Sequence, residues 1–423
     1  MADRADVEVP KTPSLKGVVL LSVMWFTSLV GALVLMAPSL ALLPVPLDAA
    51  RAAYRRWNSL VVGQWLALSA LLLERAMGVR VVLTGDLVPL AADAPERAML
   101  ICNHRTRIDW MFLWCACARL GQLGALKVML KDSLRKPPGF GWAMQAGLYV
   151  FLSRDRARDL AHIGAALRHA SAYEPRVCLL VFPEGTDLSP SNVALSRAFA
   201  REHGLAQYER VLTGSGRGDE AEAPSLSLRY EHVLHPKVAG VAAALDALRG
   251  ELDALYDVTL GYADHARGER PSEWSLLAWR APREVHVHVE RKRLAELPSH
   301  SERAVSGWLR PLWARKEALL ARFAERGRFA ERALGSTAAA TLERRARRAY
   351  ALAAAFWAVA CGATVVALAR ARAPRWWVLG AALAYGAVTA ACTGLDVLEV
   401  RWGKRSAPRA LAVKHARAGL KAD

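Results

Sequence analysis

A long uncharged segment near the start of the chain restricts the folds open to it. Residues 17–43 contain no charged side chain and are mostly apolar. This length exceeds the ~20 apolar residues that an α-helix needs to cross a bilayer. A cleaved signal peptide would have a shorter apolar core and a small-residue cleavage site, and neither is evident. We therefore expect a membrane anchor in front of whatever domain follows.

A second apolar stretch, residues 60–73, comes after three arginines. It is short for a membrane span, so a re-entrant or interfacial helix is at least as consistent with it. Either arrangement would hold the following residues at a membrane surface. We predict membrane-anchoring helices over residues 17–78, preceded by a polar, disordered N-terminus at residues 1–16.

The C-terminal third repeats the contrast between basic and apolar segments. Residues 301–348 have a helical pattern rich in arginine, which suits a solvated face or contact with anionic headgroups. Two apolar stretches, 350–368 and 376–397, then predict a transmembrane hairpin over residues 349–400. A basic tail, residues 401–423, ends the chain.

The net charge of +18 indicates anionic partners. We find no zinc-finger spacing, RNA-binding aromatic signature or basic zipper, so nucleic acid is not expected as a partner. Membrane lipids and phosphorylated substrates fit the charge better. The six cysteines form no CxxC pair, and several lie in apolar runs, which is typical of reduced, buried thiols.

Residues 79–300 have the pattern of a soluble α/β domain. Short apolar runs alternate with helical patterns, which predicts an α/β fold with a mixed sheet and flanking helices. Residues 213–228 show no periodicity and are interpreted as an inserted flexible loop. We expect strands at 79–83, 98–101, 127–131, 149–152, 177–182, 256–262 and 285–289, and helices at 156–171 and 238–256.

The most informative motif follows the apolar run at 98–101. His104 and Asp109 are five positions apart, which is about 140° from alignment on one continuous helix. A strand end carrying His104 and a first helical turn carrying Asp109 would let the two side chains meet. The aspartate could then fix the imidazole tautomer and stabilise the imidazolium, as in a Ser-His-Asp triad. No serine nucleophile is evident nearby, so the proton would come from a substrate hydroxyl.

Two further strand ends carry polar groups. The run at 177–182 ends in Pro183, Glu184 and Gly185, which places a carboxylate beside a turn that a ligand can approach closely. The run at 149–152 delivers Arg154, whose planar guanidinium suits phosphate. Together, a base, carboxylates and an arginine at strand ends predict a site for an anionic substrate that carries a hydroxyl group.

His286 and His288 alternate along another strand, so they share one face. Two such histidines could bind a metal, but the sequence offers no third ligand at a suitable spacing. We therefore expect an ordinary strand and no metal site.

The motifs Asn-His-Arg-Thr-Arg-Ile-Asp-Trp and Phe-Pro-Glu-Gly-Thr-Asp, about 75 residues apart, resemble those of the membrane glycerolipid acyltransferases. Residues 103–114, 138–145 and 182–188 are most similar to the lysocardiolipin and 1-acylglycerol-3-phosphate acyltransferase branch. The resemblance covers roughly residues 15–300. It implies a glycerol-phosphate acyltransferase-like fold and transfer of a fatty acyl group from acyl-CoA to the free hydroxyl of a lysophospholipid.

The resemblance also implies roles for single residues. His104 matches the general base and Asp109 its orienting partner. Arg154 matches a second-block arginine implicated in binding the acceptor's phosphate, while Glu184 and Gly185 match the third block, associated with the acceptor. Five residues are expected to support the site, and a sixth, the fourth-block proline, falls just after the inserted loop. These six are Asn103, Arg105, Thr106, Pro183, Thr186 and Pro236.

The implied chemistry needs no metal or cofactor, because acyl-CoA is a co-substrate already activated as a thioester. The endoplasmic reticulum is the expected membrane, with a mitochondrial membrane as the alternative. A second hypothesis is a catalytically silent protein of the same fold that binds lipid or shapes membranes. The presence of His104, Asp109, Arg154 and Glu184 favours the enzyme.

Overall fold

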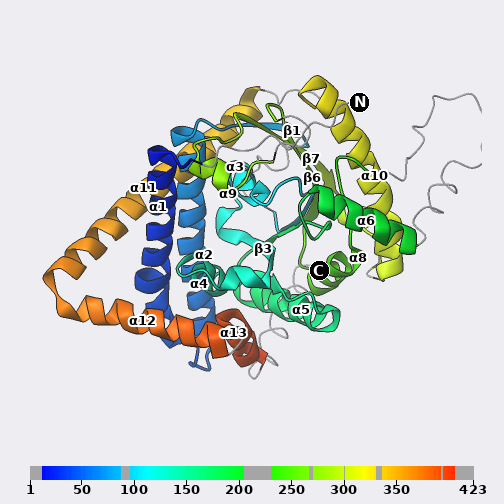
Figure 1. Cartoon of the computed structure of the whole chain (residues 1–423). Coiled ribbons are helices and arrows are strands. Elements are labelled where there is room, and N and C mark those ends of the chain that lie inside the picture. The colour runs from blue at the N-terminus through cyan, green and yellow to red at the C-terminus, as the bar shows by residue number, and fades with distance from the viewer. Residues whose placement is uncertain are drawn as a thin grey trace, which may run out of the picture.

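A computed structural model describes residues 12–86, 96–203, 230–265, 270–299, 301–329, 336–391 and 394–404. A seven-stranded sheet has helices on both faces, and a group of long helices stands beside it (Figure 1). The predicted loop at 213–228, most of the predicted basic tail and most of the predicted disordered N-terminus lie outside these residues.

The sheet runs in the order β1-β7-β6-β2-β5-β3-β4. Its strands are β1 (Arg80–Gly85), β2 (Ala98–Cys102), β3 (Leu126–Lys131), β4 (Val150–Leu152), β5 (Cys178–Val181), β6 (Ala254–Tyr262) and β7 (Glu284–Lys292). Only the β6–β7 pair is antiparallel. The predicted mixed α/β sheet is therefore confirmed.

The parallel strands explain where polar groups gather. β6, β2, β5, β3 and β4 all point the same way, so their carboxyl ends meet at one edge. All five residues of β2 are buried, as expected for a central strand covered on both faces. Ligands of open α/β sheets bind outside the carboxyl ends of such strands.

Two apolar cores lie on opposite faces of the sheet. One contains Leu100 and Cys102 of β2 with α2 (Asp48–Leu71), α3 (Asp109–Leu120) and part of α11 (Ser336–Arg370). The other contains Met99 and Ile101 with α5 (Arg156–Tyr173), α8 (Val238–Ala247) and α10 (Glu302–Arg326). The remaining helices among the described residues are α1 (Leu15–Val30), α4 (Phe140–Ala146), α6 (Pro190–Glu202), α9 (Glu273–Leu277), α12 (Arg372–Ala391) and α13 (Leu395–Lys404).

The N-terminal helices extend beyond their apolar segments. α1 continues through a π-helical turn and a 3₁₀ turn, giving a 28-residue apolar unit, Leu15–Leu42. The residues 60–73, too short alone, belong to a 29-residue unit, Asp48–Ala76, formed by α2 and a further π-helical turn. Both units are long and apolar enough to cross a membrane.

The C-terminal helices differ from the predicted boundaries. α11 begins at Ser336 and joins part of the predicted basic region to the first apolar stretch. Its first half packs on the body through Leu342, Ala346, Tyr350, Ala353 and Trp357, a stripe at helical spacing. Residues 337–370 are long and apolar enough to span a membrane, whereas α12 and α13 meet both conditions only as a pair bent by 77°. The predicted hairpin at 349–400 is thus the second part of one long helix followed by two shorter helices.

One predicted helix was too long. The pattern at 238–256 predicted a single helix, but α8 ends at Ala247 and residues 254–256 belong to β6. Leu255 and Tyr256 instead lie in the register of β2 and are buried in the sheet. The alanine-rich pattern favours a helix throughout, and it does not show that the last residues pair with β2 as a strand.

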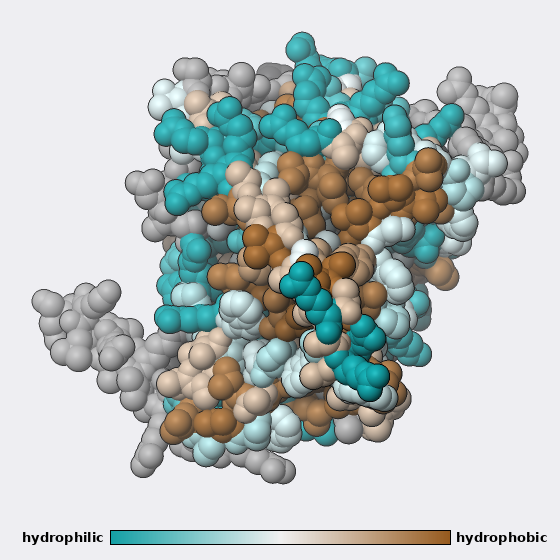
Figure 2. Space-filling view, turned by 90° about the vertical axis from the view of Figure 1, so that its left-hand side faces the viewer, coloured by the Kyte–Doolittle hydropathy of each residue, from teal (hydrophilic) through white to brown (hydrophobic). Residues whose placement is uncertain are grey.

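Figure 2 shows a broad apolar area on the side where α1, α11 and α12 lie. Its large exposed side chains include Val19, Val23, Trp25, Phe26, Leu352, Val359, Val365, Val366, Trp376, Leu379 and Leu383. A soluble protein rarely exposes so large an apolar area, and such an area marks a membrane or protein contact.

Candidate active site

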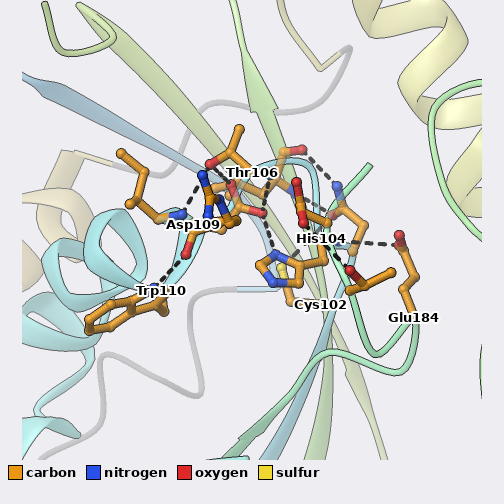
Figure 3. Close-up of polar contacts among 12 residues, drawn as sticks. Cys102, His104, Thr106, Asp109, Trp110 and Glu184 are labelled. Atoms are coloured by element: carbon orange, nitrogen blue, oxygen red, sulfur yellow. Dashed lines mark hydrogen bonds and ion pairs between the residues drawn. The ribbon is translucent and has the colours of Figure 1, made fainter. Parts of the chain in front are cut away.

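His104 and Asp109 meet as the sequence predicted. β2 ends at Cys102 and α3 begins at Asp109, and the intervening turn brings His104 Nδ1 to 3.0 Å from Asp109 Oδ2 (Figure 3). The Asp109 side chain is completely buried, while 16% of the His104 side chain is exposed. The imidazole therefore has one nitrogen held inside and one edge open to a ligand.

The surroundings of Asp109 fix the histidine tautomer. Thr106 donates its N–H to Oδ2 at 3.0 Å and its hydroxyl to Oδ1 at 2.9 Å, and the Tyr262 hydroxyl also donates to Oδ1. A carboxylate that receives these donors can only accept, so the Nδ1 proton of His104 points at it. The lone pair of Nε2 is then free to take a proton.

Glu184 lies behind the histidine rather than in the open site. Its carboxylate is buried and accepts N–H groups from His104 at 3.2 Å, Leu234 at 3.0 Å and the Trp313 indole at 3.3 Å. Burial raises the pKa of Glu184 well above its ordinary value, and the hydrogen bonds from Leu234, His104 and Trp313 oppose that shift. The geometry makes Glu184 a support for the His104 backbone, and acceptor contact by its side chain stays a prediction.

Gly185, in contrast, is exposed. Its φ of 72° lies in the left-handed region, and a Cβ there would come within 3.2 Å of Lys237 Nζ. The Lys237 N–H donates to the Pro183 carbonyl at 2.7 Å, and Pro236 is buried beside it. The predicted third and fourth blocks are therefore in direct contact.

Arg154 leaves the end of β4 towards solvent. It has a φ of 73°, and its N–H is held by Asp159 Oδ2 at 2.8 Å. Burial and the nearby charge of Arg154 lower the pKa of Lys237. Among the described residues, neither cationic side chain has an ion-pair partner. The two neighbouring cationic side chains form a basic corner of the site.

The supporting residues divide into framework and surface groups. Asn103 is buried and exchanges two hydrogen bonds with the Leu260 backbone, at 2.8 and 3.1 Å, which join β2 to β6. Thr106 holds Asp109 directly. Thr186 accepts a hydrogen bond from Asn192 at 2.9 Å, which orders the turn after Gly185. Arg105 is half-buried, and its proposed acceptor contact stays a prediction.

Three residues of the site were missed from the sequence. Tyr262 ends β6, parallel to β2, so a correct strand order would have brought it to Asp109. Lys237 directly follows Pro236, so the match of Pro236 to the fourth block could have pointed to it. Trp313 lies on α10, more than a hundred residues from Glu184, and no local pattern indicates that contact.

The histidines of β7 behave as strand residues. His288 Nδ1 lies 3.1 Å from the Thr84 hydroxyl, and His286 Nε2 lies 2.8 Å from Glu284. Over the residues that the structure describes, no group of three or more His, Cys, Asp or Glu side chains could hold a metal ion.

A narrow apolar cavity lies between the long helices and the sheet domain. Trp110, next to Asp109, is part of its wall and packs against Trp114 and Phe140. The lining residues come from α1, α2, α3, α4 and α11 and are almost all apolar. The cavity thus connects the membrane-facing helices with the helix that carries Asp109.

Comparison with known proteins defines the class. The sequence model of the Acyltransferase family matches residues 88–210, and that of the Acyltransferase C-terminus matches residues 275–357. The first range contains His104, Asp109, Arg154 and Glu184. The fold, the paired histidine and aspartate and these matches define an acyltransferase.

Individual relatives narrow the class. The chain is 36% identical to lysocardiolipin acyltransferase 1 of Danio rerio, over 73% of this chain and 72% of the relative. It is 34% identical to a probable 1-acyl-sn-glycerol-3-phosphate acyltransferase 5 of Arabidopsis thaliana, over 65% of each. A lysophosphatidylinositol acyltransferase 10 of Caenorhabditis elegans is 31% identical over 63% of each. No solved structure matches. The chain belongs to the family of lysocardiolipin and 1-acylglycerol-3-phosphate acyltransferases.

Proposed function

We propose that this protein transfers a fatty acyl group from acyl-CoA to the free hydroxyl of a lysophospholipid. The observation that carries the proposal is the His104–Asp109 pair, with an open Nε2, beside an unpaired cationic corner. Lysophosphatidic acid and lysocardiolipin are the leading acceptors, because relatives are named for both.

His104 Nε2 takes the proton of the acceptor hydroxyl while its oxygen attacks the thioester carbonyl. Asp109 stabilises the imidazolium that forms. The tetrahedral intermediate then collapses, the carbon–sulfur bond breaks, and the leaving thiolate receives the proton from His104. The products are an ester and free CoA. The step needs no covalent enzyme intermediate, and we propose that it needs no metal or cofactor.

Arg154 and Lys237 bind the phosphate of the acceptor in this scheme. Arg154 follows β4, and Lys237, just before α8, is bonded to Pro183 in the turn after β5. Both lie at the sheet edge that carries His104, so a short glycerol phosphate could reach both the cations and the base. Binding the phosphate fixes the hydroxyl near Nε2, and such positioning supplies much of the rate of an acyl transfer.

The apolar cavity receives an acyl chain. Its position beside the membrane-facing helices lets a lipid enter sideways, without leaving an apolar environment. We propose that the protein works at the endoplasmic reticulum membrane.

The proposal is tested with membranes containing the wild-type protein, labelled acyl-CoA and a panel of lysophospholipids. Label should enter one acceptor class and stay at background with His104→Ala. His203→Ala is a matched control, because His203 is exposed at the end of α6. Incorporation by His104→Ala equal to wild type would overturn the mechanism. A wild type that binds lysolipid but transfers no label would favour the silent lipid-binding alternative.

A further inference from the structure

The last helix in the described part of the chain, α13, inserts two carboxylates into the sheet domain. Asp396 and Glu399 are three positions apart, so they share one face of the helix. Asp396 is fully buried and Glu399 is 2% exposed. Figure 1 places α13 beside α5, at the far end of α12 from α11.

Asp396 contacts the segment before α4. Its Oδ1 accepts a hydrogen bond from Arg135, and its Oδ2 lies 3.4 Å from His162 Nε2. Next to it, the Leu395 N–H donates to Gln145 Oε1 at 2.9 Å. Gln145 in turn donates to the Arg135 carbonyl at 3.1 Å and to the Thr389 hydroxyl of α12 at 3.2 Å.

Glu399 contacts α2 and α5. Its Oε1 lies 2.8 Å from Arg55 Nε and 2.8 Å from His169 Nε2. The buried Arg55 guanidinium also donates to the Ala146 carbonyl at the end of α4. Lys127, equally buried, donates to the next carbonyl, that of Gly147, at 3.0 Å.

The carboxylates of α13 complete the buried ion pairs of this region. Three buried cations face this region, Arg55, Lys127 and Arg135, and Glu174 is the sheet domain's own buried carboxylate, bound to Lys127 at 3.0 Å. Asp396 and Glu399 supply the remaining buried negative charge, and Arg135 also pairs with the half-exposed Asp132 at 2.7 Å. Removing one partner of a buried ion pair leaves an uncompensated charge, which is strongly unfavourable. The site between α2, α4 and α5 is therefore incomplete without α13.

The same contacts reach the apolar cavity. Gln145 and Ala146 directly follow Ala143 and Met144, which line it. Phe140, at the start of α4, lines it as well. On the outer side of α4, the Trp142 ring stacks on Tyr385 of α12 at 5.4 Å between centroids. α4 is thus held between the cavity on one side and the C-terminal helices on the other.

We infer that Asp396 and Glu399 are positioning residues that fix α4, and that through α4 they set which acyl chains the cavity accepts. This inference rests on the proposed function, in which the cavity holds the acyl chain. A wall fixed by buried ion pairs keeps a constant cavity length. If α4 becomes mobile, the cavity no longer distinguishes acyl chains that differ by one or two methylene groups.

The test compares full-length wild type, Glu399→Gln and Asp396→Asn in membranes supplied with an equal mixture of acyl-CoA chain lengths. The variants should change the ratio between the best chain and one two carbons different by up to about fourfold for each methylene that loses its contact. The KM for the lysolipid acceptor should stay within about twofold of wild type, because the cationic corner is untouched. Arg401→Gln, an exposed change on the same helix, should leave the profile unaltered.

His169→Gln is the milder variant for use if the carboxylate variants fail to fold. It removes one contact of Glu399 and keeps Arg55, so it should shift the chain profile in the same direction by a smaller amount. A folded Glu399→Gln or His169→Gln with the wild-type chain profile would overturn the inference. Failure of the proposed function looks different, because the wild type would then transfer no acyl chain of any length.

Discussion

At the scale of single residues, the site separates groups that react from groups that hold them. His104 has one ring nitrogen open to a ligand, and its other ring nitrogen contacts Asp109. Asp109 accepts hydrogen bonds from Thr106 and Tyr262, and Glu184 accepts the backbone N–H of His104. The cations Arg154 and Lys237 stand apart from this hydrogen-bonded set. Acceptor binding and proton transfer should therefore respond to different substitutions.

Lys237→Gln should raise the KM for the acceptor by at least about tenfold, because a hydrogen bond to a charged group contributes ~1.5–3 kcal/mol. The KM for acyl-CoA should change little, and Lys237→Arg should recover most of the loss. Steady-state kinetics with each substrate varied in turn give both constants. Equal increases in the two KM values would contradict a role in acceptor binding.

Two half-buried histidines, His232 and His235, predict acid sensitivity. Burial and the charge of Arg310 lower the pKa of His235 to about 4, and burial also lowers the pKa of His232. The unfolded chain takes up protons on these histidines near pH 6.5 and the folded chain does not, so stability should fall as the pH drops from about 6.5 towards 4. Thermal unfolding in detergent should show a smaller decrease for His235→Gln. An identical pH dependence in the variant would contradict this assignment.

At the scale of elements, the sequence predicted those helices, strands and turns that depend on local patterns. The strand at β2, the start of α3 and the turn between them follow from an apolar run, a polar junction and an amphipathic segment, so the His104–Asp109 contact was predictable. The end of α8 and the extra length of α11 were not, because sheet pairing and packing decide them. The burial of Glu184 also depends on α10, because Trp313 donates to its carboxylate, and only the tertiary fold brings the two together.

A substitution in α10 tests whether Glu184 depends on this helix. Trp313→Phe removes one donor from Glu184, which should lower the free energy of unfolding by ~1–3 kcal/mol and reduce kcat by loosening His104. Trp308→Phe, a partly buried tryptophan on the same helix, is the control. Wild-type stability and activity in Trp313→Phe would show that Glu184 does not depend on α10.

At the scale of the whole molecule, the exposed apolar area and the long helices place one side of the protein in a lipid environment. High salt screens charge attraction but leaves apolar contacts intact. The protein should therefore stay with membranes in high salt and in alkaline carbonate and be released only by detergent. Sedimentation followed by immunoblotting measures this. Release by salt alone would mean that the basic surface, and not the apolar helices, holds it there.

Catalysis in the proposed mechanism depends on His104 acting as a base that Asp109 orients. The most direct measurement is kcat for Asp109→Asn, with KM determined for both substrates and exposed Glu202→Gln as the control. An amide cannot stabilise the imidazolium and favours the wrong tautomer, so kcat should fall by about 10³-fold or more while both KM values stay within about threefold. A folded Asp109→Asn protein that keeps kcat within about tenfold of wild type would contradict the mechanism.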